Sequence, residues 1–222
     1  SSLLTWYSVI NGDVNLSFGG GVKVSEWADM SGNGNNVSQS TVNRQPNWVE
    51  GRHAISCDNS GVSGVDDYMD LDTEITLDTS ATGWTVAANW TSLDWDSANQ
   101  SIVGDSGGSN NIIRATGGAD QILVKVGGNS NTFTLGEALT DGRFVSTIVV
   151  CKTDGTINLY IDGVETGGDK DCGTNDLVIN QICAKGNVHT LGGSVRDIMI
   201  YRKTIDASER ALLNQFMVLR QF

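Results

Sequence analysis

The stretch Asp70-Leu71-Asp72-Thr73-Glu74 carries three carboxylates at alternate positions. Alternate residues of a β-strand point to the same face, so a strand here places Asp70, Asp72 and Glu74 side by side. Two carboxyl groups about 5–5.5 Å apart can cleave a glycosidic bond with retention of configuration, one as nucleophile and one as acid. The same charges also keep an exposed edge strand soluble. We adopt the edge-strand interpretation and keep glycoside hydrolysis as its alternative.

A second stretch, Gly104-Asp105-Ser106-Gly107-Gly108, has the G-D-S-G-G spelling found around the nucleophile of serine proteases. The related G-x-S-x-G elbow needs a strand, a turn and a helix in that order, whereas residues 109–114 predict a turn followed by a strand. A serine nucleophile also needs an activating His and an orienting Asp. His53 is the only upstream His. We therefore predict a Gly-rich hairpin loop here and expect that the chain is not an enzyme.

A candidate metal site involves the stretch from Trp27 to Asn36, which has one large anchor, one carboxylate and then a Gly- and Asn-rich run. Such a run favours a fixed loop, and Trp27 is expected to fill the core beneath it. Asp29 and Asn33 of this loop, together with Asp67, would supply the oxygen ligands that Ca²⁺ prefers if the two loops meet at one rim. The alternative is that Asp29 and Asn33 only form hydrogen bonds within their own loop.

Sugar binding would need an exposed aromatic ring beside polar groups. Trp95 is the candidate carbohydrate-binding residue because it lies in the polar stretch 91–97. Trp27, Trp84 and Trp90 are expected in the core.

The four cysteines are Cys57, Cys151, Cys172 and Cys183, and none forms a C-x-x-C motif. With only two His in the chain, a zinc site is not expected. Cys57 and Cys151 lie in strand-like runs and are interpreted as small buried apolar residues. Cys172 and Cys183 flank a short segment and could pair in an oxidising compartment, although free thiols are the default expectation.

The composition excludes several classes of partner. A formal net charge of −12 over 222 residues argues against nucleic acid and anionic membranes, because both require a basic face. No apolar run approaches the ~18 residues of a membrane span. The chain opens on Ser1 without a visible signal peptide, from which we expect synthesis in the cytoplasm.

The elements that position these residues are mostly short strands. Residues 84–91 alternate apolar and polar positions, and residues 144–152 are apolar on both faces, as in a central strand. Residues 156–164 predict a hairpin that turns at Asp162-Gly163. Near the end, Asp206 and Glu209 form a capping box, and Leu212, Phe216 and Leu219 recur at helical spacing. The pattern predicts one all-β domain over residues 1–222, a two-sheet sandwich with one short C-terminal helix.

Several motifs together resemble those of laminin-G-like domains. They are the W-x-D-x-S-G-x-G-N run from Trp27, the D-D-Y-x-x-L run from Asp66, the L-Y-I-D-G-V run from Leu159, and a final strand, residues 193–201, that leads into the helix. The resemblance implies a concanavalin A-like jelly-roll β-sandwich of two antiparallel sheets. Laminarinase-like glycosidases of this fold use E-x-D-x-E, and the chain has Asp70 where their nucleophilic Glu stands, which argues against the same chemistry.

The resemblance also implies binding or assembly. Our leading hypothesis is a non-catalytic structural protein on a virion surface, such as a bacteriophage capsid decoration, knob or fibre protein, with other virion proteins as partners and host glycans as a further ligand. The alternatives are a secreted carbohydrate-binding lectin module and, third, a polysaccharide hydrolase or lyase. A cation-rich C-terminal stretch supports the assembly hypothesis: it contains Arg196, Arg202, Lys203, Arg210 and Arg220 and ends in Phe222. The alternative is that these cations balance local carboxylates.

Overall fold

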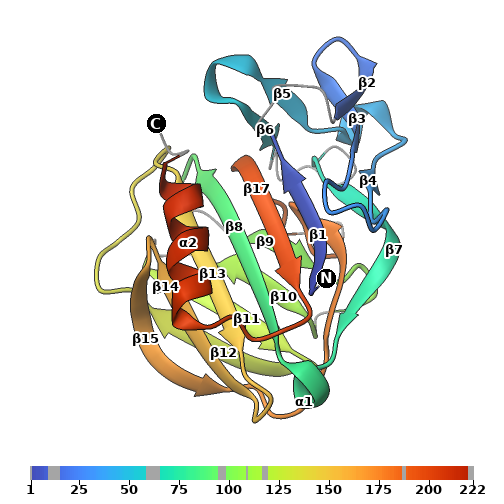
Figure 1. Cartoon of the computed structure of the whole chain (residues 1–222). Helices are drawn as coiled ribbons and strands as arrows, with labels where there is room; N and C mark the ends of the chain where they lie inside the picture. Colours follow the sequence, from blue (N-terminus) through green and yellow to red (C-terminus); the bar gives the residue numbers. More distant parts are fainter. Residues whose placement is uncertain are drawn as a thin grey trace.

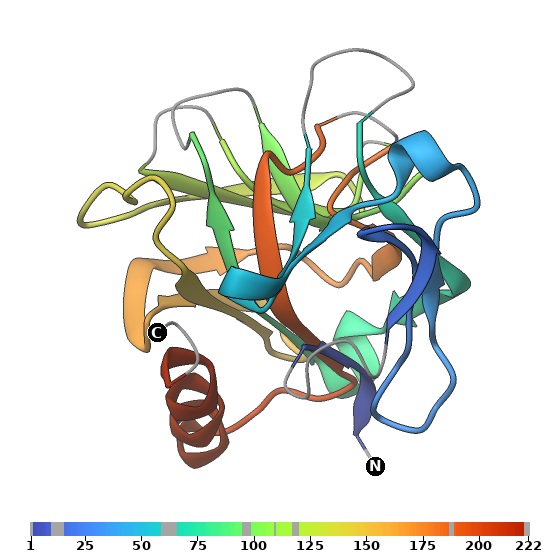
Figure 2. The same cartoon turned by 90° about the horizontal axis from the view of Figure 1, so that it is seen from above.

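A computed structural model describes residues 2–9, 16–58, 66–94, 99–108, 110–116, 120–186 and 189–219 of the chain. The strands form two antiparallel layers with a helix on the outside of one of them (Figures 1 and 2). This arrangement is the predicted jelly-roll β-sandwich with one C-terminal helix. No helix in these ranges is long and apolar enough to cross a membrane.

One layer, which we call the helix-covered sheet, has the strand order β1-β17-β8-β13-β14-β15. Its strands are β1 (Leu3–Ser8), β17 (Gly193–Tyr201), β8 (Trp84–Ser92), β13 (Val145–Cys151), β14 (Thr156–Ile161) and β15 (Val164–Asp171).

The other layer, which we call the second sheet, has the order β4-β7-β16-β9-β10-β11-β12. Its strands are β4 (Val37–Ser38), β7 (Met69–Leu77), β16 (Leu177–Ile182), β9 (Gln100–Gly104), β10 (Ile112–Ala115), β11 (Gln121–Val126) and β12 (Asn129–Thr134).

A group of short N-terminal strands connects the two layers. It contains β2 (Leu16–Gly20), β3 (Lys23–Trp27), β5 (Asn47–Val49) and β6 (Ala54–Cys57), with two 3₁₀ turns, η1 (Val42–Arg44) and η2 (Glu50–Arg52). Strand β3 pairs with β4 of the second sheet, and β6 pairs with β17 of the helix-covered sheet. The helices are the single turn α1 (Thr79–Thr82) and α2 (Ala207–Val218).

The main core fills the space between the sheets and includes the aromatic residues that the sequence predicts there. Trp27, Trp84 and Trp90 are fully buried. The indole N–H of Trp27 donates to the backbone oxygen of Ser8, 3.3 Å away, so this side chain is both apolar filler and a hydrogen-bonded anchor. The expectation that Trp27 fills the core is confirmed.

The hairpin and the central strand are also confirmed. Asp162 and Gly163 both have positive φ, 50° and 84°, as a two-residue turn of the I′ type requires. Strand β13 is buried along its whole length because β8 and β14 flank it while α2 and the main core cover its two faces.

A second apolar cluster lies between α2 and the outer face of the helix-covered sheet, with Met217, Leu213, Met199 and Ile148 among its members. It explains why β8 is buried on both faces although most of its residues are polar or small. On the helix side, Asn89 Nδ2 donates to the backbone oxygen of Met217 at the end of the helix. The predicted capping box of Asp206 and Glu209 is present.

Three details differ from the sequence expectations. The strand predicted at residues 70–74 is longer than expected, since β7 begins at Met69 and continues to Leu77. The helix is buried through Leu213 and Met217, while Leu212 is 68% and Leu219 71% exposed, because the face that meets β13 is one residue further round than the predicted Leu212 and Leu219 positions.

The third correction concerns the cysteines. Cys183 is bonded to Cys57, not to Cys172, and Cys57 is therefore not a free buried thiol. Cys151 and Cys172 are the free cysteines, both buried with their sulfurs 3.6 Å apart. The pairing depends on β6 and the end of β16 meeting in space, at a sequence separation of 126, which local spacing cannot reveal.

Candidate functional site

A polar groove on the outer face of the second sheet brings together both chemically suggestive stretches of the sequence. Its volume is about 460 Å³. The lining residues are Tyr68, Asp70, Leu71, Glu74, Ser106, Asn180 and Gln181. The acidic strand and the G-D-S-G-G loop are therefore neighbours, which the sequence analysis, treating each alone, did not anticipate.

Strand register explains this proximity. Asp70 of β7 pairs with Gln181 of β16, and Gln181 pairs with Gly104 at the end of β9. Residues paired in this way point to the same face of a sheet. The loop that follows Gly104 carries Ser106, and it turns over the end of β16 before β10 begins at Ile112.

Two amide side chains hold the carboxylates of the groove in place. Asn180 Nδ2 donates to Glu74 Oε2 at 3.3 Å and to Asp105 Oδ1 at 3.2 Å, and its Oδ1 accepts from the backbone N–H of Ser106 at 2.7 Å. Gln181 Nε2 donates to Asp70 Oδ1 at 2.8 Å. Each carboxylate keeps further acceptor capacity, since an ionised carboxylate has about four lone-pair sites.

The predicted acidic face of the strand is present. Asp70, Asp72 and Glu74 are exposed, whereas Met69 and Leu71 are buried. Only Asp70 and Glu74 line the groove, while Asp72 Oδ1 accepts from the hydroxyl of Ser38. This arrangement supplies acceptors for sugar hydroxyls on one side of the groove and amide groups between them.

Ser106 lacks the surroundings of an activated nucleophile. After β9 the chain makes a turn and then enters strand β10, as predicted, so there is no strand-turn-helix elbow. None of the hydrogen bonds of the described residues joins Ser106 to a histidine. His53, the upstream candidate, packs edge-on against Trp48, with the centres of the two rings 6.3 Å apart.

The loop from Trp27 to Asn36 uses the oxygens of Asp29 internally. Oδ1 accepts from the backbone N–H groups of Trp6 and Ser31, both at 2.9 Å. Oδ2 accepts from the Ser31 hydroxyl at 2.8 Å and from the Asn35 N–H at 3.1 Å. Partial burial raises the pKa of Asp29, but these hydrogen bonds outweigh it and hold the pKa below its usual range.

The other two calcium candidates are also engaged in protein contacts. Asn33 donates through Nδ2 to the backbone oxygens of Leu3 and Leu4, both at 2.9 Å. Asp67 accepts from the backbone N–H of Asp58 and lies 3.6 Å from Lys23 Nζ.

No group of three or more His, Cys, Asp or Glu in the described ranges is placed to hold a metal ion. Asp29, Asn33 and Asp67 are engaged in the separate contacts described above, and a calcium site formed by them stays a prediction. The other candidate ligand-binding residue, Trp95, lies outside the described residues.

The cation-rich C-terminal stretch is largely engaged within the chain. The guanidinium of Arg196 lies 3.8 Å from the centre of the Phe144 ring, and that of Arg210 lies 4.0 Å from the centre of the Tyr160 ring. Lys203 forms an ion pair with Glu209. Arg220 and Phe222 are outside the described residues.

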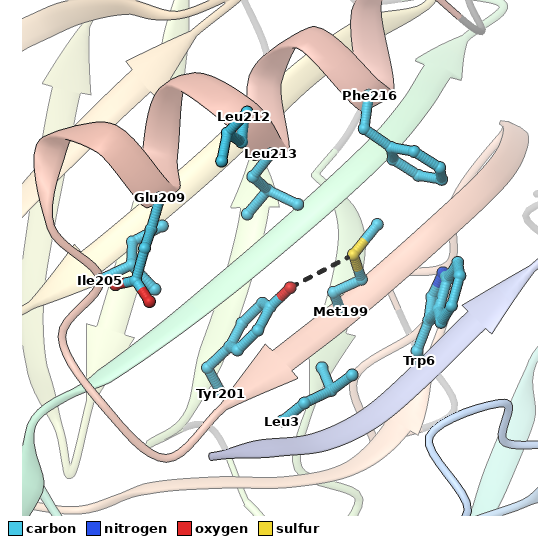
Figure 3. A pocket seen from close by; sticks show the side chains of 9 residues that line it. All are labelled: Leu3, Trp6, Met199, Tyr201, Ile205, Glu209, Leu212, Leu213 and Phe216. Atoms are coloured by element: carbon cyan, nitrogen blue, oxygen red, sulfur yellow. Dashed lines mark hydrogen bonds between the residues drawn. The ribbon is translucent and has the colours of Figure 1, made fainter. Parts of the chain in front are cut away.

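An apolar groove of about 380 Å³ lies beneath α2 on the helix-covered sheet. Figure 3 shows Trp6 and Phe216 at one end of it and Tyr201 beside Met199 at its floor, with the hydroxyl of Tyr201 directed at the Met199 sulfur, 3.6 Å away. Its lining is almost entirely apolar, with Glu209 as its charged member. It offers few of the hydrogen-bonding groups that orient a polar ligand.

Asn180 and Gln181 are the candidate functional residues that sequence reasoning missed. They stand side by side near the end of an otherwise apolar strand, Leu177–Ile182. An adjacent polar pair in such a strand was the available signal. Only the pairing of β16 with β7 and β9 shows that the pair lies next to Asp70, Glu74 and Ser106.

The family of the chain follows from sequence comparison. Residues 59–209 match the sequence model of the Concanavalin A-like lectin/glucanases superfamily. The match covers more than half of the chain, and the protein therefore belongs to this superfamily. No curated protein matches the chain.

Solved structures share the fold at low sequence identity. The binding domain of Paraclostridial Mosquitocidal Protein 1 superposes with a TM-score of 0.64 at 15% identity, over 96% of this chain and 52% of that one. The binding domain of botulinum neurotoxin serotype G gives 0.67 at 11% identity, over 96% and 51%. A Trypanosoma rangeli sialidase gives 0.61 at 11% identity, over 99% and 33%.

The chain spans about half the length of these toxin binding domains and a third of the sialidase. At such identities the likeness establishes the fold alone.

Proposed function

We propose that this protein is a glycan-binding module that binds sugars in the polar groove without cleaving them. The observation that carries the proposal is the set of carboxylates held by Asn180 and Gln181 on a sheet face that no described helix covers. Sugar hydroxyls donate hydrogen bonds, and carboxylates that the two amides hold in place can accept them. The buried Tyr68 adds an aromatic ring to the lining.

The relatives support this proposal. The superfamily name includes lectins, and one structure of the same fold, at 13% identity and a TM-score of 0.60, is described as botulinum neurotoxin type C, whose cell entry depends on two ganglioside molecules. The same superfamily name includes glucanases, so the non-catalytic part of the proposal needs its own test.

Binding can be tested with an array of neutral oligosaccharides. Asn180→Ala removes the side chain that links Glu74, Asp105 and the Ser106 backbone, and we expect it to weaken binding of any bound sugar by about tenfold. Glu74→Gln should weaken binding less, because it keeps the shape but removes an acceptor charge. Glu137→Gln, at an exposed position outside the groove, is the matched control. If the protein binds no glycan on the array, the proposal is refuted.

Catalysis can be tested on the bound glycans themselves. After long incubation with the wild-type protein, mass spectrometry should show intact oligosaccharides. Cleavage that disappears in Glu74→Gln would overturn the non-catalytic assignment and favour the glycosidase alternative.

A location on a virion surface is a further proposal, which rests on the sequence resemblance alone. A glycan-binding module would serve there as an adhesin. Co-sedimentation of the purified protein with particles that lack it supports this location. A secreted precursor with a signal peptide, combined with no particle binding, would favour the lectin alternative.

A further inference from the structure

A second groove lies on the outer face of the same sheet and has the opposite charge. It measures about 210 Å³. Its lining residues are Ile112, Arg114, Leu123, Lys125, Ser130, Lys185 and His189. The lining contains three permanent cations and no carboxylate, in a chain that has 14 Lys and Arg against 26 Asp and Glu. We call this feature the cationic groove.

Strand register places the polar groove and the cationic groove on one face. A single row of paired residues crosses the sheet from Asp70 through Gln181, Gly104 and Ile112 to Lys125. Paired residues share a face, so the two ends of this row, one acidic and one basic, point to the same side. Neighbouring strands are about 4.8 Å apart, so β16 and β10 are separated by about 10 Å. A short oligosaccharide can span this distance.

The cations of the groove have no acidic partners among the described residues. None of the ion pairs in these ranges involves Arg114, Lys125 or Lys185. Arg114 Nε is buried without a hydrogen-bond acceptor. A buried donor without an acceptor is costly, so the guanidinium of Arg114 is not fully satisfied by the described part of the protein.

The loop after β16 forms the boundary between the two grooves. A Cβ added to Gly104 would lie 2.8 Å from Lys185 Cβ and 2.9 Å from the backbone oxygen of Ala184. Because Gly104 has no side chain, this loop can lie directly on the sheet. Lys185 is thereby placed over the cationic groove. The bond between Cys57 and Cys183 fixes the start of the loop.

The pKa of His189 reflects the positive potential in the groove. Burial lowers its pKa, and the charges of Arg114 and Lys185 lower it further. His189 has a positive φ of 53°, a conformation that non-glycine residues adopt infrequently. Its ring lines the same groove as Arg114 and Lys185.

We propose that the cationic groove binds the carboxylate or sulfate group of an acidic glycan whose neutral sugars lie in the polar groove. This inference rests on the proposed function and names its ligand class. A volume of about 210 Å³ suits one charged group and not a whole oligosaccharide. The carboxylates of Asp70 and Glu74 on the same face disfavour a continuous polyanion, so the ligand should combine neutral sugars with an isolated anionic group.

Matched glycans can test this proposal. Lactose, its sialylated form and its sulfated form differ in one anionic group, and the second and third distinguish carboxylate from sulfate. We expect wild-type protein to bind at least one acidic form about tenfold more tightly than lactose, with an advantage that falls as salt increases. The double variant Lys125→Gln/Lys185→Gln should lose this advantage and retain its affinity for lactose.

The control is the double variant Lys152→Gln/Arg202→Gln. It changes net charge equally at two exposed positions outside the groove, so it should retain the preference for the acidic form. Equal melting temperatures of the two double variants would show that both are folded.

A wild-type protein that binds lactose and both acidic forms equally would overturn the cationic groove while leaving the proposed function intact. A protein that binds no glycan would overturn both. An acidic preference that survives in Lys125→Gln/Lys185→Gln would place the anion elsewhere and refute this inference.

Proton NMR provides a direct readout because the chain has two His. Binding of an acidic form should raise the pKa of His189, since the anion offsets Arg114, Lys125 and Lys185, the charged groups that line the groove with it. Lactose should leave it unchanged. The resonance of His53, which packs against Trp48, should not move in either case. An unchanged His189 titration with a bound acidic form would contradict the proposal.

Discussion

The outer faces of the two sheets differ although both sheets share one core. On the helix-covered sheet, α2 buries Met199, Ile148 and Tyr160 in a second apolar cluster. On the second sheet, the corresponding face carries Glu74, Asn180 and Lys125 at the surface, and neither of the described helices lies over them. The inner faces of both sheets pack against each other in the main core and so stabilise the fold in the same way. The difference therefore lies in what each outer face does: one adds stability, and the other offers ligands a polar surface.

The largest effect should come from the shared core. Trp27→Ala removes a fully buried ring and its hydrogen bond to Ser8. We expect a loss of roughly 3–5 kcal/mol in the free energy of unfolding, seen as a melting temperature lower by about 10 °C or more. Phe18→Ala, at a ring that is 38% exposed, should cost much less. Equal effects of the two changes would show that Trp27 does not anchor a common core.

The bond between Cys57 and Cys183 ties the N-terminal strands to the second sheet. Removing a native disulfide typically costs about 2–5 kcal/mol. Cys57→Ala/Cys183→Ala should lower the melting temperature accordingly, and a reducing agent should bring the wild-type protein to the same value. The reducing agent should have no further effect on the variant. A further effect would show that Cys151 and Cys172, whose sulfurs are 3.6 Å apart, form a second disulfide and are not free thiols.

The helix-covered face can be tested with two adjacent leucines. Leu213 is 8% exposed and Leu212 is 68% exposed. Leu213→Ala should cost about 2–3 kcal/mol in the free energy of unfolding, and Leu212→Ala less than about 0.5 kcal/mol. Neither change should alter glycan affinity. An altered affinity in Leu213→Ala would contradict the separation of a stabilising face from a binding face.

A smaller effect concerns pH. Burial raises the pKa of Asp67 to about 6, against the opposing charge of Lys23. The folded state then binds this proton more tightly than the unfolded state, so its contribution to stability is greatest at low pH and falls as pH rises from about 4 through 6. Asp67→Asn should remove this slope, worth about 1–3 kcal/mol, in melting curves recorded between these pH values. A slope that persists in the variant would assign it to another carboxyl group.

The smallest effect should be that of calcium. Because Asp29 accepts four hydrogen bonds from its own loop and from β1, we expect a calcium titration to leave the melting temperature unchanged. A bound ion would add about 2.7 kcal/mol at a hundredfold excess over Kd. A rise of that size would support the site predicted from Asp29, Asn33 and Asp67.

The sequence alone determined the fold class and much of its local detail. Strand alternation, the Asp162-Gly163 turn and the capping box of Asp206 and Glu209 are local signals, and local signals survive in the structure because they act within a few residues. The burial of Trp27 followed in the same way from one large apolar residue before a loop.

Tertiary structure alone decided the disulfide, the buried face of α2 and both grooves. Cys57 meets Cys183, and Asp70 meets Gln181, through strands that are far apart in the sequence. Such contacts depend on register between strands, and a shift of one residue would turn every side chain to the other face. The sequence therefore contained the charged residues of the binding face, and only the pairing of the strands assembled them into sites.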